Sequence, residues 1–132
     1  MAINSITKLH TFLHAISDEK RIRSLKMLEI KPLCICQLTA VLEIRQPTVS
    51  KHMTKLKKAN IVFEKRIGQF TVYLLNRKHP FINIWWVTSC LIDNSIVMKD
   101  KKKLNKLNTK IPLKLDSQSA MNQEDRWRKR LD

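Results

Sequence analysis

The chain has 132 residues, enough for one folded domain with a tail, and 43% of them are hydrophobic, which excludes a wholly disordered protein. Lysines and arginines number 26 against 11 aspartates and glutamates, so the net charge is +15. Such a surplus favours a polyanionic partner, either nucleic acid or an anionic membrane surface.

Four short helices are predicted in the first 60 residues. Apolar residues at helical spacing indicate helices within 5–16 and 17–30, and Ser17 or Asp18 is the expected N-cap of the second. Pro32 opens a third helix at 33–42, and a fourth covers 46–59 with a proline in its first turn. A three-residue turn joins the last two helices, as in a helix-turn-helix.

A β-hairpin is predicted next, at 62–75, because the single glycine, Gly68, separates two apolar-rich runs. The fold class is therefore mainly α with a small β-hairpin, a winged helix-turn-helix. The run from 79 to 98 is apolar on nearly all sides and predicts a helix through which two copies dimerise. Polar residues, among them Asp93, interrupt this run, so we expect no membrane span, a cytoplasmic location and reduced cysteines.

The composition changes near Lys99, and the rest of the chain is polar, rich in lysine and asparagine, and ends in the basic cluster RWRKR. We therefore expect a DNA-binding and dimerisation domain at 1–98 and a basic, flexible tail at 99–132. The residues leave open whether this tail docks on DNA phosphates or stays solvated.

The fourth helix and the hairpin form the candidate DNA interface. Residues 45–66 hold seven basic side chains and one acidic one, a local charge of +6 that suits the phosphates of double-stranded DNA. The first turns of the fourth helix would read the bases. Alternatively, Gln46 and Thr48 only cap this helix and His52 packs beneath it. The candidate contacts are Gln46, Thr48, Ser50, Lys51, His52, Lys55, Lys65, Arg66 and Gln69.

Two thiols, Cys34 and Cys36, stand two residues apart at the start of the predicted third helix. Side chains at i and i+2 diverge on an ideal helix, whereas they share a face in an extended segment. Holding one ion would therefore require residues 34–36 to leave helical geometry. We hypothesise that this distortion tilts the DNA-reading helices away from the operator. The alternative is that both thiols are small core residues.

These segments resemble the ArsR/SmtB family of metal-responsive repressors, most closely its arsenic-responsive type. LHAISDEKRIRSLKMLE is similar to the first helices of that family, LCICQL to its metal box, RQPTVSKHMTKLKKANIV to its recognition helix and RIGQFTVYLL to its wing. The resemblance covers residues 9–75. It implies a homodimer that represses its own operon and leaves the DNA when an ion binds Cys34 and Cys36.

The chain departs from the family pattern at three positions. Asn60 replaces the usual glycine before the wing, and asparagine tolerates the left-handed conformation. Gln37 stands where the metal box has aspartate. Thr39 occupies a position at which arsenic-responsive members often carry a third cysteine.

Thiolates suit As(III), Sb(III), Cd(II) and Pb(II), and the resemblance favours arsenite; two cysteines alone fit zinc poorly. The candidate third ligand is Cys90, a small-molecule thiol or solvent. One alternative is a thiol-redox regulator of the same fold that pairs Cys36 with Cys90. Another is an effector-independent basic DNA-binding protein. No nucleophile–base pair, phosphate loop or paired carboxylates are recognised, so we do not expect an enzyme.

Overall fold

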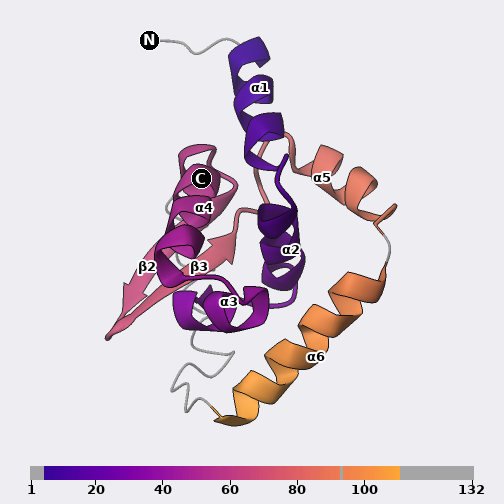
Figure 1. Ribbon diagram of the computed structural model, residues 1–132. Helices are drawn as coiled ribbons and strands as arrows, with labels where there is room; N and C mark the ends of the chain where they lie inside the picture. Colours follow the sequence, from indigo (N-terminus) through magenta and orange to yellow (C-terminus); the bar gives the residue numbers. More distant parts are fainter. Residues whose placement is uncertain (1–4, 93, 111–132) are drawn as a thin grey trace.

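The computed structural model describes residues 5–92 and 94–110 (Figure 1). Helices dominate, and a small sheet lies at one side of them. The elements in chain order are α1 (Ser5–Ala15), α2 (Glu19–Leu28), β1 (Leu33–Cys34), α3 (Ile35–Leu42), α4 (Gln46–Lys58), β2 (Val62–Ile67), β3 (Phe70–Leu75), α5 (Ile82–Ser89) and α6 (Asn94–Lys110).

The sheet is antiparallel with the strand order β1-β3-β2. Strands β2 and β3 form the predicted hairpin, in which Ile67 lies opposite Phe70 across a two-residue turn. Gly68 has φ +60° at the first position of this turn, where a residue with a Cβ would be strained. The prediction of a wing at 62–75 is confirmed.

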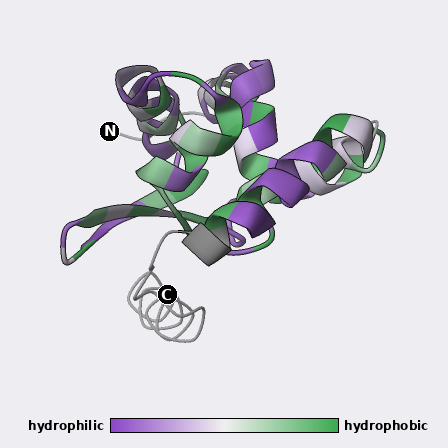
Figure 2. Cartoon of the chain, turned by 60° about the horizontal axis from the view of Figure 1, so that its bottom comes forward, coloured by the Kyte–Doolittle hydropathy of each residue, from purple (hydrophilic) through white to green (hydrophobic). Residues whose placement is uncertain are grey.

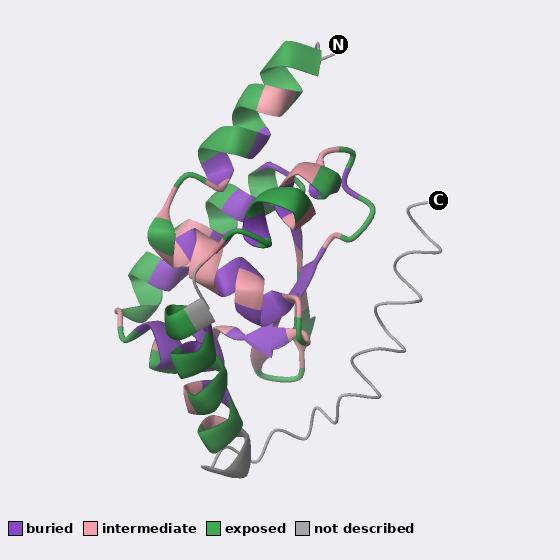
Figure 3. Ribbon diagram, turned by 90° about the vertical axis from the view of Figure 1, so that its right-hand side faces the viewer, coloured by how far each residue is buried: buried purple, intermediate pink, exposed green. Residues whose placement is uncertain are grey.

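The core lies where α2, α3 and α4 meet the sheet. Leu25, Leu38 and Val49, one from each of these helices, have no exposed surface, and Figure 3 shows buried residues concentrated at this junction. Of the two predicted N-caps of α2, Asp18 is the one found, and its carboxylate accepts hydrogen bonds from the backbone N–H groups of the first turn. Asn60 has φ +60°, the left-handed conformation expected of it.

The third helix begins later than predicted. Leu33 and Cys34 are extended because they pair with Tyr73 and Val72 of β3, and α3 starts only at Ile35. The predicted start at residue 33 was therefore wrong, because a pairing with a strand almost forty residues away decides this backbone and local pattern does not reveal it.

The segment after the wing also differs from the prediction. Instead of one helix over 79–98, α5 ends at Ser89 and α6 begins at Asn94. The predicted tail boundary at residue 99 falls inside α6, because α6 has an apolar side that packs on the domain: Val97 and Leu104 are 6% and 1% exposed. Residues 111–132 of the predicted tail lie outside the described residues.

A buried ion pair holds α6 against α2. The guanidinium of Arg23 donates two hydrogen bonds to the Asp100 carboxylate, at 2.7 and 2.9 Å, and the Asp100 side chain is 3% exposed. Most of the other residues of α6 are hydrophilic, and the cartoon coloured by hydropathy shows them among the apolar ones (Figure 2). Across residues 5–92 and 94–110, no helix is long and apolar enough to cross a membrane.

Candidate nucleic-acid interface and thiol pair

The exposed face of α4 carries four of the nine predicted contacts. Arg45 is the extended N-cap of α4, and Pro47 lies in the first turn, where its missing N–H costs nothing. Val49, Met53 and Leu56 turn inward with no exposed surface. The opposite side of the helix is therefore open to a partner; its exposed predicted contacts are Gln46, Thr48, Lys51 and Lys55.

Ser50 and His52 lie lower on α4, against the domain. The side chain of Ser50 is hydrogen bonded to Tyr73, a tyrosine of β3 whose hydroxyl pKa is raised by burial. The Nδ1 atom of His52 accepts a hydrogen bond from the Arg21 guanidinium at 3.0 Å. Burial lowers the pKa of His52, which favours the neutral ring that can accept this bond. His52 thus packs beneath the helix, the alternative that the sequence left open.

Arg21 was not anticipated as part of this region. It is 5% exposed, donates through Nε to the carbonyl of Ala15 at the end of α1, and reaches His52 of α4 with its other end. Its signal in the sequence is a charged residue on the inward face of an amphipathic helix. Such a residue needs buried partners, which only the fold identifies.

The wing supplies further positive charge. Arg66 and Gln69 are exposed near its tip, and Lys65 is half-buried on β2. Lys57 of α4 forms an ion pair with Glu64 of the wing at 2.7 Å, so the wing's acidic group already neutralises one of the seven basic side chains. The remaining basic residues of α4 form the stronger candidate surface for phosphates.

Cys34 and Cys36 converge at the junction of β1 and α3. Cys34 is the N-cap of α3 with φ −79° and ψ 160°, and Cys36 lies in the first turn. Their Cα atoms are 5.4 Å apart, and the two sulfurs are joined as a disulfide, whereas the sequence analysis expected free thiols. Because Cys34 is already extended, the sulfurs meet without unwinding α3. The expectation that residue 34 is helical is therefore wrong, and the distortion of this turn by a bound ion stays a prediction.

Gln37 reinforces this junction. Its side chain is buried, and Oε1 accepts a hydrogen bond from the backbone N–H of Cys34 at 3.0 Å. The glutamine therefore closes a capping box at the start of α3, an arrangement that satisfies a backbone donor left over by the helix. The residue that replaces the aspartate of the metal box thus has a structural role.

Cys90 lies at the C-terminal end of α5, where it is exposed and its thiol donates to the carbonyl of Trp86 at 3.0 Å. Within the described part of the chain, no three His, Cys, Asp or Glu side chains gather closely enough to hold a metal ion. The pairing of Cys36 with Cys90 is not found, since Cys36 is bonded to Cys34. A third ligand from Cys90 stays a prediction.

Comparisons with known proteins point to one family. Residues 18–63, which hold the thiol pair and α4, match the model of the bacterial regulatory protein arsR family. The chain is 37% identical over 71 residues to the arsenic resistance transcriptional regulator ArsR1 of Pseudomonas putida, and the match covers 53% of each protein. It is 34% identical over 79 residues to the arsenical resistance operon repressor of Staphylococcus xylosus, covering 60% of this chain and 74% of that one.

The fold has close counterparts among solved structures. HlyU from Vibrio cholerae superposes with a TM-score of 0.59 at 23% identity, over 68% of this chain and 98% of HlyU. At that identity the likeness concerns the fold alone. The chain spans about half the length of the Pseudomonas relative. The matched proteins are transcriptional regulators, in agreement with the expectation that this chain is not an enzyme.

Proposed function

Because the chain belongs to the arsR family of bacterial regulatory proteins, we propose that it is a cytoplasmic DNA-binding repressor that arsenite releases from its operator through Cys34 and Cys36. One observation carries this proposal: two cysteines converge at the N-cap of α3, the helix that packs against the exposed, basic helix α4. In this proposal, sensing and DNA reading belong to neighbouring helices.

Double-stranded DNA is the partner that the charge of α4 and the wing favours. Lysines on the exposed face of α4 provide phosphate contacts, while Gln46, Thr48 and Lys51 in its first two turns carry groups that can read base edges. Ser50 and His52 instead support the helix from below. Lys65, Arg66 and Gln69 extend the contact along the wing.

A homodimer is the form that the exposed apolar residues support. Such residues are costly in water when they gather, and a second copy would cover them. Two copies would also present two recognition helices to successive half-sites of an operator. These residues lie on α1, on α5 and just beyond its end, and at the start of α6: Ile6, Leu13, Val87, Leu91, Ile96 and Met98.

The reduced thiol pair provides two soft ligands on one side of the chain, which suits As(III) or Sb(III) and, with additional ligands, Cd(II) or Pb(II). Cys34 is 1% exposed and Cys36 is partly exposed, so an ion reaches the pair from the side of Cys36. Solvent or a small thiol completes the coordination. An ion held between the two sulfurs would shift Cys34 from its N-cap position. The hydrogen bond from the Cys34 backbone N–H to Gln37 would then be strained.

A shift of Cys34 would affect DNA binding by displacing α3, which packs against α4. Cys34 is both the N-cap of α3 and a partner of Val72 in the sheet, so it cannot move without disturbing one of them. Because α3 packs against α4, a displaced α3 changes the angle at which α4 meets the major groove. The ion shifts the equilibrium only by its preference for the displaced state.

The disulfide favours a second candidate function, thiol-redox sensing. In that case the thiols of Cys34 and Cys36 lose two electrons and two protons to an oxidant such as a peroxide, which is reduced to water. The same junction would then respond to bond formation between the sulfurs. Cys34, rather than Cys90, would be the partner of Cys36.

Fluorescence anisotropy on duplex DNA from upstream of the gene tests these functions. Reduced protein should bind, and arsenite should release the wild type but not Cys34→Ser/Cys36→Ser. A Cys90→Ser variant that needs more arsenite for release than the wild type would identify Cys90 as the third ligand. Release by a peroxide without any response to arsenite would establish the redox function instead. Binding that neither reagent changes would leave an effector-independent DNA-binding protein. Titrations with Sb(III), Cd(II) and Pb(II) would rank the ions.

A further inference from the structure

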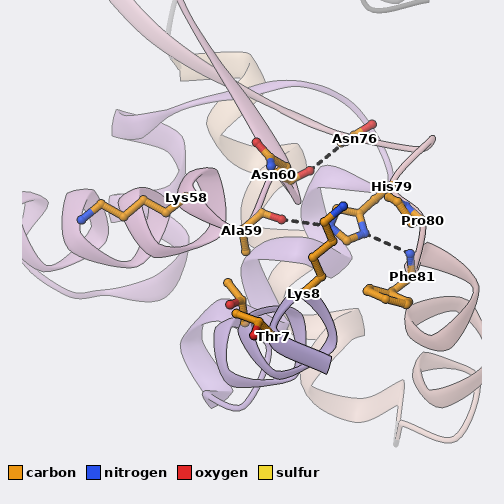
Figure 4. Close-up of a pocket in the computed structure, with 10 residues that line it drawn as sticks. Thr7, Lys8, Lys58, Ala59, Asn60, Asn76, His79, Pro80 and Phe81 are labelled. Atoms are coloured by element: carbon orange, nitrogen blue, oxygen red, sulfur yellow. Dashed lines mark hydrogen bonds between the residues drawn. The ribbon is translucent and has the colours of Figure 1, made fainter. Parts of the chain in front are cut away.

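His79 lies in the connection between β3 and α5 and is 8% exposed (Figure 4). Its Nδ1 atom accepts a hydrogen bond from the backbone N–H of Phe81 at 3.0 Å, and Nε2 lies 2.9 Å from the carbonyl oxygen of Ala59. A backbone N–H can only donate and a carbonyl can only accept. The ring is therefore neutral, with its proton on Nε2.

These two bonds join two helix ends. Ala59 is the C-cap of α4, so its carbonyl is one of the groups that a helix leaves without an internal partner. Phe81 is the N-cap of α5, whose side chains provide no cap of their own. One imidazole thus satisfies the end of the recognition helix and the beginning of the next helix.

The face of the same ring contacts α1. The centroids of His79 and Phe12 are 5.0 Å apart, and Phe81 packs nearby with its centroid 6.0 Å from that of His79. Phe12 is 1% exposed, so α1 is held firmly at this point. A single side chain therefore touches α1, α4 and the start of α5, three helices that come from distant parts of the sequence.

The β3–α5 connection makes a second hydrogen bond to the end of α4, next to the one from His79. The amide nitrogen of Asn76 donates to the carbonyl oxygen of Asn60 at 2.8 Å, so two successive carbonyls at the end of α4 are bound by the β3–α5 connection. A pocket of about 230 Å³ lies beside the ring, between Thr7, Lys8 and the end of α4 (Figure 4). His79 thus adds a contact between α1 and the end of α4, beside the link that Arg21 makes between Ala15 and His52.

We propose that His79 is a positioning residue that couples the dimerisation helices α1 and α5 to the recognition helix α4 and so sets the distance between the two recognition helices of the dimer. The inference rests on the proposed function, because it requires a dimer that reads two half-sites. Its physical basis is that core packing through Val49, Met53 and Leu56 fixes the inner face of α4. The bonds to Ala59 and Asn60 attach the C-terminal end of α4 to the connection that leads into α5.

Two substitutions by amide side chains allow the two hydrogen bonds of the His79 ring, to Phe81 and to Ala59, to be tested one at a time. His79→Asn places an oxygen near the position of Nδ1, so it can cap Phe81 but is too short to reach Ala59. His79→Gln places its amide nitrogen near the position of Nε2, so it can still donate to Ala59. The two variants are otherwise similar in polarity, which makes His79→Gln the matched control for the link to α4.

The measurement is the affinity of each dimer for operator duplexes with the natural half-site spacing and with one base pair added. Wild type and His79→Gln should lose about tenfold or more on the longer spacing, whereas His79→Asn should bind the natural spacing about tenfold more weakly and discriminate little between the two. Sedimentation establishes that each variant is dimeric. A merely structural role would weaken both duplexes equally.

The outcomes separate this proposal from the proposed function. If wild type binds no upstream duplex, the repressor function fails. If wild type binds and a dimeric His79→Asn keeps the full preference for the natural spacing, the coupling role is refuted. If His79→Asn does not fold, the test rests on His79→Gln, which keeps the bond to Ala59. Loss of the preference for the natural spacing in that variant would refute the role of this bond.

Discussion

Replacing Leu104 by alanine tests the docking of α6, the element for which the sequence predicted a flexible tail. Leu104 is 1% exposed and belongs to the main core cluster. Removing a buried leucine side chain forfeits its transfer free energy and leaves a cavity, which together cost about 3 kcal/mol. With a urea m-value of about 2 kcal/mol/M, the unfolding midpoint should fall by about 1.5 M.

Tryptophan fluorescence follows the transition, because Trp85 is 2% exposed in the fold. Protein concentration is held constant, since the proposed dimer would contribute to the measured stability. Lys101→Ala, an exposed change on the same helix, should stay within about 0.5 kcal/mol of wild type. If Leu104→Ala behaved like Lys101→Ala, α6 would not be packed on the domain in solution, and the reasoning from burial would be refuted.

Asp100→Asn should lower the free energy of unfolding by about 2 kcal/mol, less than for a fully buried pair, because Arg23 keeps a side-chain exposure of 15%; an unchanged urea midpoint would contradict this. Burial lowers the pKa of His79 below its ordinary value of 6.5. As the pH falls, the unfolded chain therefore binds a proton at this ring before the folded chain does. The free energy of unfolding is thus at its full value above pH 6.5 and declines below it. Melting temperatures from about pH 7.5 to about pH 5 should fall more steeply for wild type than for His79→Gln, and equal slopes would show that this ring does not titrate on unfolding. Lys55→Gln should reduce the salt dependence of operator binding by about 1.8 in the log–log slope, for two phosphate contacts per dimer, whereas Lys57→Gln should change it less because Lys57 is already paired with a wing carboxylate. Equal slopes for the two variants would contradict this ranking.

Local chemistry made the recognition unit predictable. Pro47 suits the first turn of α4, apolar residues at helical spacing define its inner face, and Gly68 permits the tight turn of the wing. Each of these signals involves only a few neighbouring residues, so the local conformation that it favours does not depend on contacts with distant segments. The positions of the exposed candidate contacts, such as Lys51, follow from the same periodicity.

The backbone conformation at the thiol pair could not be predicted from the neighbouring residues alone. The spacing of Cys34 and Cys36 indicated that residues 34–36 must leave helical geometry for the sulfurs to meet, and in the structure only Cys34 does so. The sequence could not show that Cys34 already has this backbone, because its pairing with Val72 in β3 imposes it. Predicting the site as a helix that must unwind was the result of this missing contact.

The sequence by itself thus determined the family, helix α4 and the β2–β3 hairpin, since these depend on short-range periodicity, caps and turns. Only the tertiary structure decided which polar residues are satisfied inside. Arg23 and Asp100, 77 residues apart, bind α6 to the domain, and His79 finds Ala59 twenty residues earlier. Such partners depend on how distant segments pack, and a buried charge or imidazole is stable only where the fold supplies its counterpart.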